Sequence, residues 1–382
     1  MTASKASRLR VHADHVGSLL RPQKVKDARA QLWAQGALAR FGQGTPPPDL
    51  KAVEDAEIER AVRFQEEIGL PAVTDGEFRR AYWHYDFMAG LDGLDLVERV
   101  PEKGTSTFAL SVVPVISGPL SFPADHPMLD HFRFLASVAR HTPKMSIPGP
   151  SACHFRTLKA DIAPPQYKDP DVLFADIARA YAQALAAFYQ AGCRYLQFDD
   201  IYFAYLCDPR IRAEKQAGGE DPDWLIDRYV WMMSEAIKDR PDDMTIGMHF
   251  CRGNFQSTWI AEGGYDPIAE AIFNRIDVDV YFMEYDSDRA GGLAPLGLLP
   301  KGRKIVLPGF VTTKTPGLET LDELKRKFDE AAKYADIAQL GIAPQCGFAS
   351  TEEGNKVTED DQRRKLELVV RTAEEIWGSV TA

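Results

Sequence analysis

Thr245-Ile-Gly-Met-His249-Phe-Cys251-Arg-Gly-Asn254 is an apolar, strand-forming run that ends in a polar loop. His249 and Cys251 stand two residues apart, so both side chains leave the same edge of an extended segment. An imidazole and a thiol in this arrangement are typical metal ligands. Taken alone the pair is weak evidence, because a free cysteine is also a common small buried residue.

Two later apolar runs end in side chains that can complete a metal site. Val280-Tyr-Phe-Met-Glu284 ends in a carboxylate, and Leu340-Gly-Ile-Ala-Pro-Gln-Cys346 ends in a thiol. Two cysteines, a histidine and a glutamate are ligands that zinc accepts, and a weakly held carboxylate is one that a substrate can displace. In a barrel of parallel strands the C-terminal ends converge on one mouth. The sequence therefore predicts a Zn²⁺ site there.

Repeated alternation of strand and helix patterns predicts the fold. Helical stripes of apolar residues run over 174–188, which Gly192 terminates, and over 321–331 and 366–376. Eight such units imply an α/β fold, a closed (β/α)8 TIM barrel, with a doubly wound open sheet as the alternative. The eight apolar runs that we expect to be strands are 9–16, 71–74, 144–147, 195–198, 245–249, 278–283, 304–307 and 340–343.

The repeat is interrupted between the second and third predicted strands. Residues 82–142 hold two further strand-like runs, at 96–100 and 107–115, followed by a proline-rich stretch. We interpret 82–142 as an insertion over the barrel mouth rather than a separate domain. The expected organisation is one catalytic domain over residues 1–382.

Composition narrows the class of protein. With 382 residues, 45% hydrophobic content and a formal net charge of -11, the chain can bury a large core, and its acidity argues against a nucleic-acid or anionic-membrane partner. Residues 1–8 lack an apolar signal core, and no apolar run approaches the roughly 20 residues that span a bilayer. We expect a cytoplasmic protein with small-molecule substrates. The sequence leaves the oligomeric state open, a homo-oligomer included.

Five cysteines are present, an odd and sparse set that does not look like a disulfide framework. Free thiols are then available for a metal or for catalysis. We expect Cys153, Cys193 and Cys207 to be structural, which leaves Cys251 and Cys346 for the metal.

Polar groups that a barrel does not itself need follow three other predicted strands. Charged groups at a barrel mouth are costly unless they serve a ligand, and acids such as Glu77 and Asp199 suit the ammonium of an amino-acid thiol. For Asp199 and Asp200 the alternative is capping of the following helix. The stretches are His12-Ala-Asp14-His15-Val-Gly17-Ser18, Thr74-Asp75-Gly-Glu77-Phe-Arg79 and Gln197-Phe-Asp199-Asp200.

Sulfur-rich zinc ligation has a particular use, which is to bind an incoming thiol and remove its proton. A thiol with a pKa near 8.5 is only about 3% thiolate at pH 7, so full ionisation gains about 30-fold, or about 2 kcal/mol. Alignment of the thiolate with an electrophilic carbon can contribute more, up to about 7–11 kcal/mol.

Together these residues resemble the catalytic domain of cobalamin-independent methionine synthase, and more closely its short, single-domain relatives. The likeness runs from about His12 to the last predicted helix. It is carried by Gly17-Ser18, Asp75-Gly-Glu77-Phe-Arg79, Leu196-Gln-Phe-Asp199-Asp200, His249-Phe-Cys251, Glu284 and Pro344-Gln-Cys346-Gly-Phe.

The resemblance implies a (β/α)8 barrel in which zinc holds a homocysteine thiolate that attacks a methyl group carried by a reduced folate. It implies His249, Cys251, Glu284 and Cys346 as zinc ligands. Homocysteine would be bound by Ser18, Glu77 and Asp199, with Asp200 beside them.

The donor side departs from the full-length enzyme. Lys314 stands where the family has a proton-donating histidine, with a solvated lysine as the alternative. Phe155 and Arg156 stand where the family has an aromatic platform for the pterin. The enzyme's N-terminal half, which helps to bind polyglutamylated folate, has no counterpart in the sequence.

The expected function is methyl transfer to homocysteine from a 5-methyl-tetrahydrofolate. Another thiol acceptor, or a donor such as a methylcorrinoid, a methylated thioether or sulfonium, or an epoxide, is the first alternative. A zinc hydrolase or lyase is disfavoured, because two thiolate ligands weaken the effect of the metal on bound water. A non-catalytic protein with structural zinc would unfold when the metal is removed.

Overall fold

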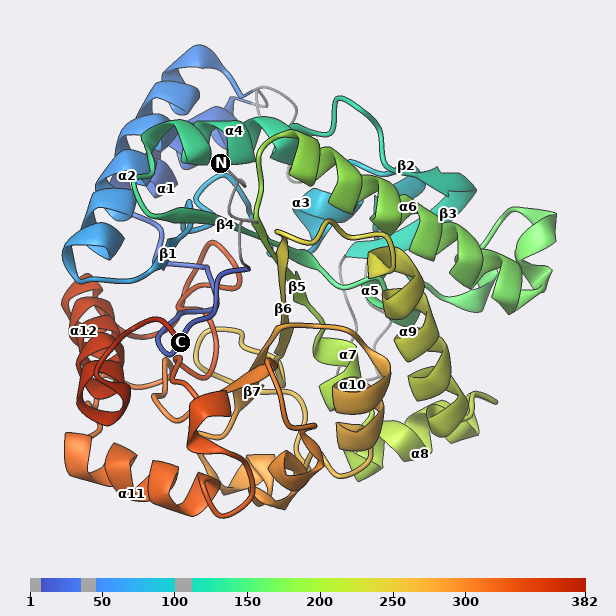
Figure 1. Cartoon of the computed structure of the whole chain (residues 1–382). Coiled ribbons are helices and arrows are strands. Elements are labelled where there is room, and N and C mark those ends of the chain that lie inside the picture. Colours follow the sequence, from blue (N-terminus) through green and yellow to red (C-terminus); the bar gives the residue numbers. More distant parts are fainter. Residues whose placement is uncertain (1–7, 36–45, 100–111) are drawn as a thin grey trace, which may run out of the picture.

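The computed structural model describes residues 8–35, 46–99 and 112–382. Within these ranges the chain forms a curled parallel sheet of six strands, in the order β1-β4-β5-β6-β7-β8, with helices around its outside (Figure 1). Six of the eight predicted strands are thus confirmed. They are β1 Ala72–Val73, β4 Thr142–Pro148, β5 Tyr195–Asp199, β6 Thr245–Phe250, β7 Val280–Glu284 and β8 Ile305–Gly309.

Burial explains why these runs are strands without an alternating pattern. Every residue of β5, β6, β7 and β8 is buried, because the sheet is covered on both faces. Strands of a covered parallel sheet read as continuous apolar runs.

The other two predicted strands, 9–16 and 340–343, form isolated bridges instead. Ala13 bridges to Ile342 and Leu340 to Val306, both in the parallel sense. The prediction of continuous strands is wrong here for a physical reason. The N–H groups of residues 12 and 13 both donate to the carbonyl of Val380, at 2.8 and 3.1 Å, and so cannot serve a neighbouring strand.

The helices bury the apolar stripes that the sequence predicted. The stripe of α6 is buried, and it consists of Phe174, Ile177, Tyr181, Leu185 and Phe188. Gly192 follows the end of α6 at a φ of 102°, where nothing lies within 4 Å of an added Cβ. None of the helices in the described ranges is both long and apolar enough to cross a bilayer. The α-helices are α1 Gln23–Ala34, α2 Pro48–Glu67, α3 Tyr85–Met88, α4 Pro127–Val138, α5 Ala152–Phe155, α6 Pro170–Gln190, α7 Ile201–Tyr205, α8 Pro209–Ala217, α9 Pro222–Ile237, α10 Ala269–Arg275, α11 Leu321–Ala331 and α12 Glu359–Trp377.

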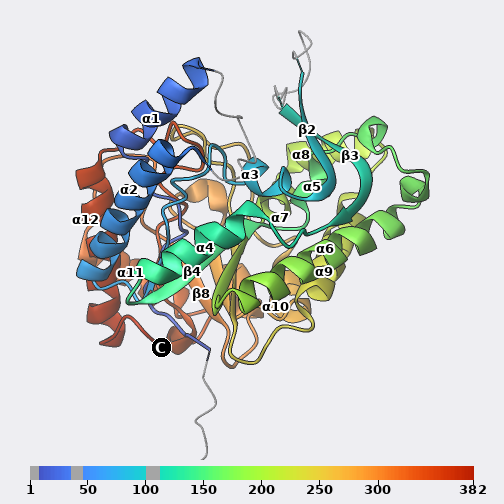
Figure 2. The ribbon, with the colours of Figure 1, turned by 90° about the horizontal axis from the view of Figure 1, so that it is seen from above.

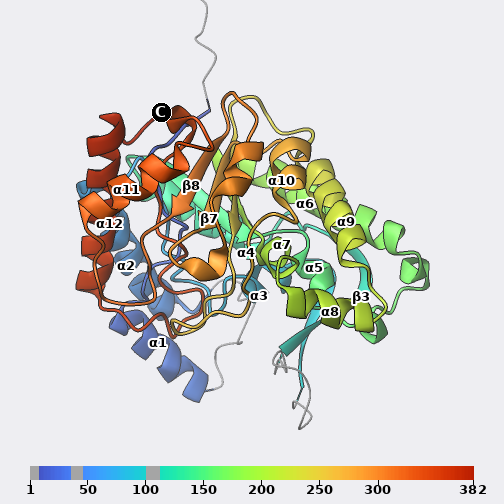
Figure 3. The same ribbon diagram turned by 90° about the horizontal axis from the view of Figure 1, so that it is seen from below.

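The segment 82–142 contains α3, two antiparallel strands and α4. β2 (Asp92–Glu98) pairs with β3 (Val112–Ser121), and both lie at the same end of the molecule as α3 and α5 (Figures 2 and 3). Part of the strand predicted at 107–115 falls on 107–111, outside the described residues. α4 packs against α2 and β4. The interpretation of 82–142 as an insertion stays a prediction.

A buried ion pair joins β4 to the N-terminal segment of the chain. Lys144 on β4 lies 2.8 Å from Asp14, measured from Nζ to Oδ1, and both side chains are fully buried. Tyr195 on β5 donates its hydroxyl to the other oxygen of Asp14 at 2.7 Å. Lys144 also donates to the carbonyl of His15. The segment before Ser18 is therefore fixed to β4 and β5.

Replacement of Phe188 by alanine tests the packing of α6 against Phe122 and against Phe132 of α4. Phe188 is fully buried in the core, so we expect the free energy of unfolding to fall by about 3–5 kcal/mol. Val172→Ala, at a half-exposed position of the same helix, serves as the control. Chemical denaturation measures both, and similar losses in the two variants would contradict this packing.

Candidate functional site

Neighbouring strands place the predicted site residues at one edge of the sheet. In the β5–β6 register Asp199 stands beside His249, and in the β7–β8 register Glu284 stands beside Gly309. These are C-terminal strand positions, so the expectation that distant strand ends meet is confirmed for them.

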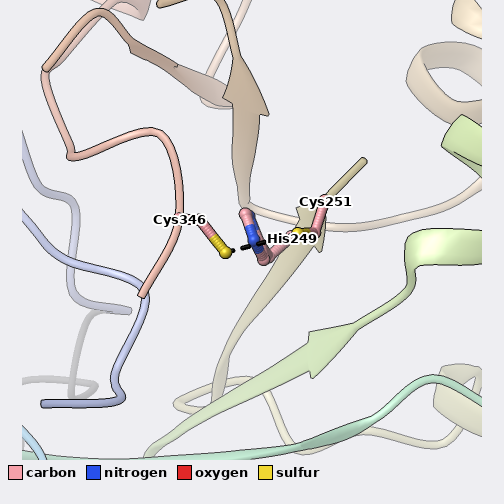
Figure 4. Close-up of side chains that lie close together, drawn as sticks. All are labelled: His249, Cys251 and Cys346. Carbon is pink, nitrogen blue, oxygen red and sulfur yellow. Dashed lines mark hydrogen bonds between the residues drawn. The ribbon is translucent and has the colours of Figure 1, made fainter. Parts of the chain in front are cut away.

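His249, Cys251 and Cys346 form a buried group whose potential ligand atoms all lie within 4.8 Å of one another (Figure 4). The two sulfur atoms are 3.2 Å apart. Neither ring nitrogen of His249 has a hydrogen-bond partner outside this group among the described residues. Buried polar atoms are nearly always satisfied, so this imidazole and the two thiols fit a metal ion that accepts nitrogen and sulfur ligands.

The two thiols differ in their readiness to ionise. The hydrogen bond from Cys251 holds the pKa of the Cys346 thiol well below its ordinary value, and the same bond, together with burial, raises the pKa of Cys251. Of the two thiols, Cys346 therefore ionises more readily, and Cys251 holds its proton more tightly. A metal that binds both sulfurs releases this proton, which makes metal binding dependent on pH.

Glu284, the fourth predicted ligand, does not belong to the group of three. Its fully buried carboxylate accepts hydrogen bonds from the Arg252 backbone N–H at 2.8 Å and from Arg289 at 3.0 Å. Burial opposes its ionisation, but Lys314 and Arg289 lower its pKa overall. Glu284 is therefore an ionised carboxylate next to the group, and its coordination of a metal stays a prediction.

A cavity of about 360 Å³ opens onto this group. His249, Cys251 and Cys346 all line it. Of the predicted substrate-binding residues, Ser18, Glu77 and Asp199 line the same cavity. The structure thus brings the thiols, the imidazole and two carboxylates together around one space that a small molecule can enter.

Glu77 is held in a backbone conformation that side chains rarely adopt, with a φ of 61°. Its N–H donates to Asp75 at 2.8 Å, and Ser146 donates to its Oε1 at 2.9 Å. The other carboxylate oxygen, Oε2, has no hydrogen-bond partner among the described residues. Such strain persists where the surroundings enforce it, often at binding sites, and the unpartnered oxygen is available to a ligand.

Asp199 and Asp200 are adjacent in sequence but have different surroundings. Burial, together with the charge of Glu77, raises the pKa of Asp199 to about 7, against the lowering effect of His249. Asp200 is absent from the described cavity lining. It accepts from Ser151 at 2.6 Å and caps α7 through the Tyr202 N–H at 3.2 Å. Asp200 therefore has the capping role that was its alternative, and its part in substrate binding stays a prediction.

The predicted donor-side residues are separated by the structure. Arg156 lines the cavity and donates to the Tyr202 hydroxyl at 2.6 Å. Phe155 does not line it; its ring packs on Tyr202, with centroids 4.7 Å apart, beneath Lys215. Of these two residues, Arg156 is the one placed to touch a ligand.

Lys314 is buried, with 7% of its surface exposed, so the alternative of a solvated lysine is wrong. Its ammonium has no hydrogen-bond partner among the described residues. Its charge lowers the pKa of Glu284 and of Cys251, but it does not line the cavity. Its proposed part in proton donation stays a prediction.

One stretch of the cavity lining was not predicted from the sequence. Tyr82, Trp83, His84 and Tyr85 all line the cavity, just before and at the start of α3. They begin three positions after Arg79, the end of the Asp75–Arg79 motif, and the run of four aromatic rings at the start of the 82–142 segment was the available signal.

The fold and the site define an α/β protein with a buried group of two thiols and an imidazole at the C-terminal edge of a parallel sheet. A family model described as the catalytic domain of cobalamin-independent synthase matches residues 34–375. The chain therefore belongs to this family. Membership supports methyl transfer of the methionine synthase type.

Three relatives show the range of the family. YxjG of Bacillus subtilis (strain 168), an uncharacterised protein, is 45% identical over 373 residues, covering 96% of this chain and 94% of YxjG. A 5-methyltetrahydropteroyltriglutamate–homocysteine methyltransferase of Corynebacterium efficiens is 25% identical over 338 residues, 87% of this chain but 40% of that enzyme. A crystal structure from Listeria monocytogenes, given the provisional name of a vitamin-B12 independent methionine synthase, has a TM-score of 0.76 at 36% identity and covers 98% of this chain and 100% of that chain.

Replacement of Cys251 or Cys346 by serine tests the metal site. A serine hydroxyl stays protonated and is a poor zinc ligand, so we expect zinc affinity to fall at least about tenfold while the circular dichroism spectrum is unchanged. Cys193→Ser is the matched control, because Cys193 is buried elsewhere and donates to the Tyr195 carbonyl at 3.2 Å. Equal zinc retention by all three variants after dialysis would argue against this site.

Proposed function

We propose that this protein is a zinc-dependent S-methyltransferase that methylates the thiol of homocysteine, with a 5-methyl-tetrahydrofolate as donor. The observation that carries the proposal is the placement of His249, Cys251 and Cys346 in the wall of a cavity that also contains Glu77 and Asp199. Sulfur ligands for a metal and carboxylates for an ammonium are the two features that an amino-acid thiol needs.

The metal would be held by His249, Cys251 and Cys346, with Glu284 proposed as the fourth ligand. Bound zinc supplies a Lewis acid that favours the thiolate form of the substrate. Arg289 and the Arg252 N–H hold Glu284 beside the group, so a carboxylate that exchanges with an incoming thiol is already in place.

The acceptor would be oriented by the other side chains in this wall. Glu77 offers its unpartnered oxygen and Asp199 its carboxylate to the substrate ammonium. Ser18 adds a hydroxyl from the N-terminal segment. Because alignment contributes more to such a reaction than thiol ionisation does, these positions are as important as the metal ligands.

The three residues of the group are open to the cavity, which favours a catalytic metal site over a purely structural one. A structural zinc site is closed on all sides by protein, whereas the three residues of this group border the cavity. A hydrolase or lyase remains the weaker alternative, because two thiolates reduce the effect of the metal on bound water.

The structure points to fewer residues for binding the methyl donor than for binding the acceptor. Arg156 is proposed to contact it, with Phe155 supporting Tyr202 from behind. Lys314, the proposed proton donor, would have to move its side chain to reach a ligand in the cavity. A methylcorrinoid, a methylated thioether or sulfonium, or an epoxide is the alternative donor.

We also infer that the segments 9–16 and 340–343, through their isolated bridges, complete an eight-stranded (β/α)8 barrel and that 82–142 is an insertion over its mouth. The parallel bridges from Ala13 to Ile342 and from Leu340 to Val306 support the closure.

Methionine formation from homocysteine tests the proposed reaction. Zinc-loaded protein is supplied in parallel with 5-methyl-tetrahydrofolate as the mono- and triglutamate, with methylcobalamin and with S-methylmethionine, and methionine is measured by mass spectrometry. We expect turnover with the folate and its loss in Cys346→Ser, with the Cys193→Ser variant active. Turnover with another donor alone would support the alternative, a thiol methyltransferase with a donor other than the folate. No turnover with any donor would argue against methylation of homocysteine.

Glu77→Gln and Asp199→Asn test the acceptor site. Each change removes a negative charge from a buried cavity, so we expect homocysteine to bind about tenfold more weakly or worse, with unchanged zinc content. Isothermal titration measures both quantities. Asp243→Asn, which lies just before β6 at the opposite end of the strand, is the control. Unaltered homocysteine affinity in both site variants would contradict the proposed role of Glu77 and Asp199 in binding the acceptor.

A further inference from the structure

His84 lines the cavity but has no role in the acceptor site described above. Its side chain is buried, with 3% of the residue exposed, and neither ring nitrogen has a hydrogen-bond partner among the described residues. A buried imidazole without partners carries a free-energy cost that a bound ligand can remove. Its position in the cavity wall makes a ligand accessible to it.

His126 provides a contrast inside the same protein. This histidine is equally buried, but its Nε2 contacts the Phe87 carbonyl at 3.0 Å and its Nδ1 accepts from the Met128 N–H at 3.2 Å. The fold thus occupies both nitrogens of His126. The ring nitrogens of His15, which is also buried, have no partner among the described residues, but His15 does not line the cavity, whereas His84 does.

The surroundings hold the His84 ring in place. Its centroid lies 4.5 Å from the ring of Trp83 and 3.9 Å from that of Tyr85. The Trp83 N–H donates to the Ser350 carbonyl at 3.0 Å, which ties this stretch to the loop that carries Cys346. The imidazole is therefore held in the wall of the cavity that His249, Cys251 and Cys346 also line, and its ring nitrogens are left without a partner among the described residues.

The chemistry of the cavity lining separates two kinds of ligand. Glu77 and Asp199 suit an ammonium, whereas His84, its aromatic neighbours and Arg156 form a part without carboxylates among the described lining residues. Arg156 and burial both hold the pKa of His84 well below its ordinary value, so the ring is neutral and carries one N–H donor. This part suits an uncharged, flat donor rather than a cation.

We propose that His84 contacts the methyl donor and donates a hydrogen bond to the atom that the methyl group leaves. This inference rests on the proposed function. The bond between that atom and the methyl carbon breaks, the new carbon–sulfur bond forms, and the leaving atom keeps the electron pair. It takes up one proton for the one that the thiol gives up, so the reaction needs no further reactant. The hydrogen bond from His84 stabilises the leaving atom as its charge develops.

His84→Phe and His84→Gln test this role, because glutamine keeps an N–H donor and phenylalanine does not. For 5-methyl-tetrahydrofolate we expect kcat/KM to fall about 100-fold in His84→Phe and to be partly restored in His84→Gln. Homocysteine affinity and zinc content, both measured by titration, should be unchanged. His141→Gln is the matched control, since His141 is exposed and lies before β4, at the far end of that strand.

A second donor separates hydrogen bonding from mere packing. S-methylmethionine releases a neutral thioether that needs no hydrogen bond, so any turnover with it should change less than threefold in His84→Phe. Equal losses with both donors, an unaffected folate reaction, or failure of both variants to fold would overturn the proposal. If the wild-type protein uses no donor at all, the proposed function itself fails, which is a result distinct from an active enzyme that ignores His84.

Discussion

The buried pair of Lys144 and Asp14 is the constraint on which the site depends. Removal of one partner from such a pair leaves an uncompensated charge in the interior, at a cost of about 3–5 kcal/mol, so the segment that contains Asp14 cannot slide along β4. That segment continues into Ser18, whose carbonyl accepts from the Phe348 N–H at 3.0 Å. At Gly347 an added Cβ would lie 1.9 Å from the Ser18 hydroxyl, so only glycine allows this approach. The N-terminal segment thereby positions the loop of Cys346.

Much of the fold could be predicted from the sequence, because covered parallel strands and amphipathic helices leave periodic patterns. The patterns failed where distant contacts decide the outcome. Residues 9–16 are apolar enough for a strand, yet their N–H groups at 12 and 13 go to Val380, far away in the sequence. Lys144 was placed in a strand correctly, but nothing local shows that its partner is Asp14.

The site was predictable to the extent that it consists of strand ends. His249, Cys251, Cys346, Glu77 and Asp199 could be found because chemically unusual residues follow apolar runs. Asp200 shows the limit, since one step along the chain turns a carboxylate from the cavity to a helix cap. His84 shows another, because its significance lies in missing hydrogen bonds, and these are visible only once all its neighbours are in place.

The spacing of the two thiols has a consequence for how the protein matures. Cys251 and Cys346 are 95 residues apart in the chain, but their sulfur atoms lie 3.2 Å apart. At about 5–20 residues per second of synthesis, Cys251 exists for about 5–20 s before Cys346 is made. A half-finished chain therefore offers only His249 and Cys251 of this group. Under the proposed function, metal loading would therefore be a step that completes the newly made protein after residue 346 has been added.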